Sequence, residues 1–71
     1  MQTRPFFLVE TRLDDEAIGR DAFWKSGTAL LFRKSQSSIY GENNVSMVND
    51  AELIEEMIKD GRIKPENIRT D

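Results

Sequence analysis

The chain of 71 residues contains neither cysteine nor histidine. Disulfide bonds, thiolate metal sites and imidazole ligands are therefore excluded, so one small hydrophobic core must hold the fold together. A chain of this length buries a smaller fraction of its surface than a typical domain does. We expect a single small domain, residues 1–71, that binds no cofactor and no metal and that gains stability by pairing with a partner or with a copy of itself.

The balance of charged and apolar residues also limits the function. Hydrophobic residues make up 38% of the chain and charged residues 32%, as is typical of a soluble globular protein. The net charge of −3 opposes binding to nucleic acid or to an anionic membrane unless basic residues cluster. No segment is apolar enough to cross a bilayer, and the short apolar run that ends at Glu10 lacks a cleavage pattern. We expect a cytoplasmic protein without a membrane partner.

Three short stretches predict β-strands. Residues 5–13 alternate partly between apolar and polar side chains, and Pro5 suits the first position of a strand. Residues 28–33, TALLFR, form a dense apolar run that predicts a central strand buried on both faces. The polar stretch that follows, residues 34–44, predicts a loop, and residues 45–48 predict a last short strand.

Residues 14–24 allow two interpretations. In the first, Asp14 caps a helix, the next two acids favour its positive end, and Ile18 and Ala22 share one face. Gly19 weakens such a helix by about 1 kcal/mol relative to alanine. In the second, residues 22–24 and 29–32 are the strands of a hairpin whose turn is KSGT, residues 25–28. We favour the short helix.

Residues 49–61 carry the clearest helical pattern. Asn49 precedes Glu52 at the spacing of a capping box, and Gly61 is the expected stop. One apolar stripe contains Leu53, Ile54, Met57 and Ile58, and Glu55 is spaced to pair with Lys59. Ile63 and Ile68 are expected to fasten the tail to the body. Together these segments predict an α+β fold, a small three- to four-stranded mainly antiparallel sheet with a C-terminal amphipathic helix packed on one face.

Two short motifs resemble ligand-binding loops, but neither has all the residues that such a loop needs. The stretch from Gly19 to Ser26 is one residue away from a phosphate-binding loop, but Trp24 replaces the second glycine that the backbone needs. Asp14, Glu16 and Gly19 match part of a calcium loop, but Ile18 and Lys25 occupy ligand positions. We interpret the first as chance, with Phe23 and Trp24 as core or interface anchors, and the acids of the second as a helix N-terminus.

The remaining candidates are binding residues. No base, nucleophile and ligand set converges, so we expect no enzyme. Size and acidity are typical of the short proteins that phages and mobile elements encode and that act by binding a host protein. We predict a small acidic protein-binding module, a regulator, inhibitor or adaptor, whose partner is a protein with a basic surface or a second copy in a homodimer. Its predicted contact residues are Trp24, Tyr40, Glu52, Glu55 and Glu56.

Two alternatives remain. No acidic residue lies between Asp21 and Glu42, so that segment forms a basic and aromatic stretch suited to nucleic acid. Its predicted contacts are Lys25, Arg33, Lys34 and Tyr40, and a second basic cluster contains Arg62, Lys64 and Arg69. The other alternative is a structural subunit of an assembly, which predicts self-association.

Overall fold

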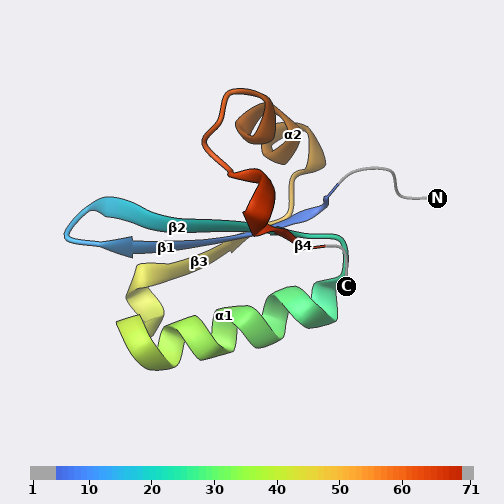
Figure 1. The fold of residues 1–71 in the computed structure, drawn as a ribbon. Coiled ribbons are helices and arrows are strands. Elements are labelled where there is room, and N and C mark those ends of the chain that lie inside the picture. Colours follow the sequence, from blue (N-terminus) through green and yellow to red (C-terminus); the bar gives the residue numbers. More distant parts are fainter. Residues whose placement is uncertain (1–4, 70–71) are drawn as a thin grey trace.

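A computed structural model describes residues 5–69 as three layers, a sheet between two helices (Figure 1). In chain order the elements are β1 (Phe7–Leu13), β2 (Glu16–Phe23), α1 (Ser26–Tyr40), the short 3₁₀ helix η1 (Glu42–Asn44), β3 (Val45–Val48), α2 (Ala51–Lys59), the 3₁₀ helix η2 (Pro65–Asn67) and β4 (Ile68–Arg69). The strands lie in the order β3-β1-β2-β4. In Figure 1, α1 lies below the sheet and α2 above it.

The α+β class is confirmed, but two finer predictions are wrong. The sheet is mixed and not mainly antiparallel, because β4 pairs with β2 in parallel while β1 pairs antiparallel with both β2 and β3. The amphipathic helix is not C-terminal, because η2 and β4 follow α2. The tail returns to the sheet because Ile63, only 1% exposed, and Ile68 pack against the core beneath α2. The prediction that the tail is fastened to the body is confirmed.

Residues 14–24 form neither the predicted helix nor the alternative hairpin. They turn at Asp14 and Asp15 and then continue as β2, so the hairpin is formed with β1 and not with residues 29–32. The φ angles of Asp14 and Asp15 are 52° and 65°. A two-residue turn with positive φ at both positions matches the twist of the strands it joins, and aspartate tolerates that conformation better than most residues do. The pair of acids is a turn signal that resembled a helix start.

The predicted strand at residues 28–33 is wrong, and the predicted loop at 34–44 is wrong for residues 34–40, because residues 26–40 form α1. The rest of that stretch contains the turn at Gly41 and the short helix η1. A short apolar run fits a buried strand as well as a helix, so the run alone did not distinguish them. The spacing over a longer stretch distinguishes a helix from a strand, because Ala29, Phe32 and Tyr40 recur at helical intervals and all pack on the sheet. Gly41, with φ of 93°, ends α1 and donates its N–H to the carbonyl of Ser37 at 2.9 Å.

The strands at β1 and β3 and the helix α2 are confirmed. Asp50, and not Asn49, caps α2, because its Oδ1 accepts a hydrogen bond from the N–H of Leu53 at 3.1 Å. The helix ends at Lys59, and Gly61 follows with φ of 85°, as expected of the residue that reverses the chain. The predicted Glu55–Lys59 pair forms at 3.2 Å.

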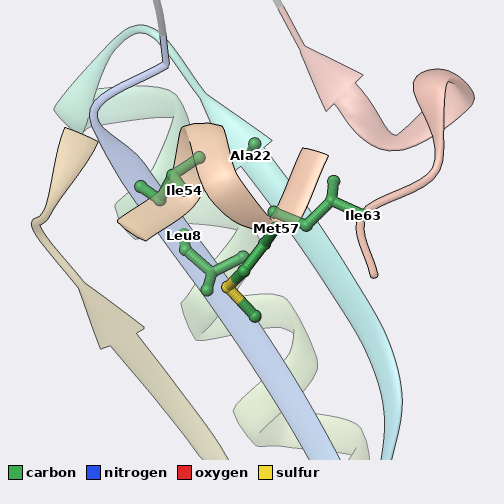
Figure 2. Packing of buried hydrophobic residues seen from close by; sticks show 5 residues of the cluster. All are labelled: Leu8, Ala22, Ile54, Met57 and Ile63. Atoms are coloured by element: carbon green, nitrogen blue, oxygen red, sulfur yellow. The ribbon is translucent and has the colours of Figure 1, made fainter. Parts of the chain in front are cut away.

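The core is divided in two by the sheet. Side chains alternate along a strand, so neighbouring residues of β1 contribute to opposite layers. On the α2 side, a cluster of five buried residues contains Leu8, Ala22, Ile54, Met57 and Ile63 (Figure 2). On the α1 side the buried cluster contains Val9, Phe23, Ala29 and Val45. The prediction of Phe23 as a core residue is confirmed.

Arg69 secures the two-residue strand β4 to the α1 side of the core. Its guanidinium donates to Asp21 Oδ1 at 3.2 Å and lies 5.1 Å from the ring centroid of Phe32 and 5.9 Å from that of Phe23. The Asp21 side chain is only 9% exposed, so the arginine supplies the charge that a buried carboxylate needs. One residue thus combines an ion pair with stacking on aromatic rings.

The hairpin turn leads to a test of the fold. We expect Asp15→Gly to raise the free energy of unfolding by about 0.5–1 kcal/mol, because glycine adopts positive φ without a steric cost and Asp-Gly is a preferred pair in such turns. Asp15→Val should lower it, since a β-branched residue resists that conformation. Urea denaturation followed by circular dichroism measures both. Equal stability of the three proteins would contradict the assigned turn.

Candidate partner-binding surfaces

The outer side of α1 exposes two adjacent leucines. Leu30 is 52% and Leu31 69% exposed, and the two are neighbours in the chain. Arg33 and Lys34, both exposed, lie one turn further along, and α1 contains no acidic residue. We call Leu30, Leu31, Arg33 and Lys34 the α1 surface. A shallow hollow beside Leu30 and the two cations is completed by Ser37, Ser38 and Glu42.

The exposed leucines follow from how α1 packs. Ala29, Phe32 and Tyr40 pack on the sheet, so the residues between them on the opposite side of the helix face away from it. Leu30 and Leu31 were not expected at the surface, because both belong to the stretch that was predicted as a buried strand. The recurrence of Ala29, Phe32 and Tyr40 at helical spacing is the signal that would have found them.

The outer side of α2 gathers acidic side chains. Glu52, Glu55 and Glu56, all predicted as contact residues, lie together around Leu53, which is 37% exposed. Asp50 and Lys59 complete the rim of the same shallow depression, and Glu55 pairs with Lys59 at 3.2 Å. We call Asp50, Glu52, Leu53, Glu55 and Glu56 the α2 surface. The apolar stripe predicted for this helix is largely buried, with Ile54 and Met57 inside and Ile58 half-buried.

Trp24 and Tyr40 do not join the acidic residues. Trp24 is half-buried where β2 leads into α1, and its backbone N–H donates to the carbonyl of Arg69 at 3.3 Å. Tyr40, also half-buried, packs against the core on the α1 side. The predicted protein contacts are therefore divided between the two sides of the sheet. Ile39 has a large apolar side chain that by itself favours a core position, but it is 69% exposed near the end of α1.

The residues predicted to contact nucleic acid lie along one helix and not in a loop. Lys25 immediately precedes α1, while Arg33 and Lys34 are exposed about two turns further on. Tyr40 lies at the far end of the helix with its ring against the core, which reduces the ring face available for stacking on a base. The structure brings Arg33 and Lys34 together and leaves Lys25 and Tyr40 at opposite ends.

A second hollow lies beside β2 and is lined by three cations, Arg20, Arg62 and Lys64. The sequence did not indicate that Arg20 of β2 lies near the two cations of the tail. Glu10 Oε2 accepts from Arg20 at 2.9 Å, and Asp60 Oδ2 accepts from Arg62 at 2.8 Å. Two of the three cations are therefore paired with carboxylates within the chain. Because these two cations are already paired, the hollow is a poor site for an anion. The Asp60–Arg62 pair instead stabilises the loop after α2.

The Asp60–Arg62 pair predicts a measurable titration. The hydrogen bond from the Arg62 side chain holds the pKa of Asp60 below its ordinary value. Because the folded-state pKa is lowered, the stabilisation is present above the ordinary carboxyl pKa and is lost as the pH falls through the lowered value. In Arg62→Gln we expect the Asp60 pKa, followed by carboxyl-carbon NMR, to rise toward its ordinary value. Lys64→Gln, as control, should leave it unchanged.

The two discarded motifs have structural explanations. Residues 19–23 of the near phosphate-binding motif belong to β2, so only a short connection to α1 remains and no loop can wrap a phosphate. The acids interpreted as a helix N-terminus instead form the hairpin turn and the start of β2. Within residues 5–69 there is no group of three or more potential metal ligands of the Asp, Glu, His and Cys type.

Comparison with protein-family models, curated proteins and solved structures finds no match to the chain. No helix among the described residues has the length and apolar character needed to span a membrane.

Proposed function

We propose that the protein is a small non-enzymatic protein-binding module, a regulator, inhibitor or adaptor, that docks through the α1 surface. The observation that carries this proposal is the exposure of Leu30 and Leu31 side by side on one helix. Adjacent exposed apolar side chains with a polar and charged rim are typical of protein-interaction sites. A helix already formed and fixed to a sheet also loses little conformational entropy on docking.

The charges around the leucines indicate the chemistry of the partner. Arg33 and Lys34 are exposed, α1 contains no acidic residue, and Glu42 of η1 is the one carboxylate among the residues that line the hollow beside them. A complementary partner has an apolar groove with carboxylates at its rim, which the cations steer into register while the leucines supply the buried contact. Leu31 is the more exposed of the two leucines and is the expected anchor.

The α2 surface supports a second binding site of opposite charge. Leu53, 37% exposed among glutamates, combines an apolar contact with an acidic rim, which suits the partner with a basic surface. The α1 and α2 surfaces lie on opposite sides of the sheet (Figure 1). Partners at the two surfaces do not compete for space, and this arrangement favours an adaptor.

Nucleic acid is the alternative ligand of the α1 surface. Lys25, Arg33 and Lys34 supply the charge for phosphate contacts, whereas the exposed leucines add nothing to such contacts. Binding to phosphates weakens steeply as salt rises, and binding through leucines does not. The acidic total charge also opposes it. Protein is therefore the proposed partner.

The function is tested with two double variants and a photo-crosslinking residue. A crosslinker at position 31 should capture one stoichiometric protein from lysate of the source organism after nuclease treatment. We expect Leu31→Ser with Lys34→Glu to weaken binding of that purified protein at least about tenfold, as for a hot-spot anchor. Titration calorimetry measures the affinity, and circular dichroism checks the fold.

The matched control is Glu52→Gln with Glu56→Gln on the opposite side of the sheet. This variant should bind the captured protein as the wild type does. If it loses binding while the α1 variant does not, the acidic surface is the docking site. Capture that disappears with nuclease, together with a steep salt dependence, would instead assign the α1 surface to nucleic acid.

A further inference from the structure

The sheet has a free edge at the four-residue strand β3. Residues 45–48 pair on one side with residues 8–11 of β1 in an uninterrupted antiparallel register. No strand among the described residues pairs with the other side of β3. Alternate backbone N–H and C=O groups of an edge strand point outward without a ladder partner, so such an edge is a template for another strand.

The opposite edge of the same sheet is protected. The outer strand there, β4, comprises two of the described residues, Ile68 and Arg69. Where β2 extends beyond β4, its pairing with β1 is interrupted by a bulge between Thr11 and Arg12, and Glu16 and Arg20 add charges. Short strands, bulges and charged side chains are the devices by which proteins prevent edge-to-edge pairing.

The β3 edge is short, but it has neither the charges nor the bulge that protect the opposite edge. Its four residues, Val45, Ser46, Met47 and Val48, include no charged residue and no proline, and the register has no bulge. Ser46 is exposed, while Met47 and Val48 are half-buried at the edge. A protein that protects one edge and leaves the other uncharged and regular has an edge suited to pairing.

We propose that β3 pairs antiparallel with β3 of a second copy about a two-fold axis, joining two four-stranded sheets into one of eight strands. A two-fold contact places each patch against itself, so an edge strand without charge avoids the like-charge repulsion that a charged one would suffer. A domain of this size also gains stability from a shared sheet.

The pleat limits the register. Residues opposite each other in an antiparallel pair point to the same face, so each residue nearest the axis must face its own copy. The axis therefore passes between the two copies of Ser46 or between the two copies of Met47. Either register brings the two Ser46 side chains to the same face within about 8 Å. An axis perpendicular to the sheet also keeps the two copies of α1 on one side, so the dimer presents two α1 surfaces in the same direction.

The test introduces a charge at the exposed position nearest the axis. We expect the wild type to sediment as a dimer at tens of micromolar, and Ser46→Glu to raise the dimer dissociation constant at least tenfold with an unchanged circular dichroism spectrum. Ser46→Thr, the uncharged control, remains dimeric. Mixing Ser46→Glu with Ser46→Lys restores a heterodimer, which a misfolded variant cannot do.

A wild type that sediments as a monomer throughout this range, or a Ser46→Glu variant that stays dimeric, would overturn the proposal. The Leu31→Ser, Lys34→Glu variant changes neither residue at the proposed axis and should remain dimeric. Loss of partner binding in that variant and loss of the dimer in Ser46→Glu are therefore separate results. The dimer and the proposed function can each fail without the other.

Discussion

The fold depends on the burial of β1 from both sides. Leu8 and Val9, adjacent in this inner strand, are 2% and 0% exposed and contribute to the clusters on the α2 side and the α1 side respectively. A strand buried on both faces needs a layer above and a layer below. The two helices supply those layers, and β2 and β3 supply the backbone partners of β1 on either side.

This arrangement separates two kinds of charge. The helix on one side contains Arg33 and Lys34 and no acid, and the helix on the other presents Glu52 and Glu56 outward. The chain has a net charge of −3, but that sum hides two surfaces of opposite character. Electrostatic attraction to a partner depends on the local surface, so the net charge alone is a poor guide to the partner.

The elements that were predicted correctly have patterns that no competing structure satisfies. The α2 sequence combines a helical stripe with a following glycine, and the β1 sequence begins with apolar side chains and then alternates partly with polar ones. The errors fall where a short stretch satisfies two structures. Asp14 and Asp15 suit a helix start and a turn equally, and TALLFR suits a buried strand and an amphipathic helix equally.

The candidate site was predicted only in part for the same reason. Glu52, Glu55 and Glu56 were recognised together because the helix that carries them was recognised. Leu30 and Leu31 were missed because an incorrect element assignment reversed their exposure. Trp24 and Tyr40 have large side chains that suit a core or an interface, and local sequence does not say which side of a sheet a residue will occupy.

The sequence by itself determined that the domain is small, lacks disulfides, and combines strands with an acidic amphipathic helix. Those properties follow from residue identity and from spacing within about a dozen residues. Only the tertiary structure decided the parallel addition of β4, the placement of the helices on opposite sides, and the free edge at β3. Each of these features depends on which segments far apart in the chain lie side by side. That arrangement is selected by the packing of Phe23, Ile54 and Ile63 and not by local conformational preference.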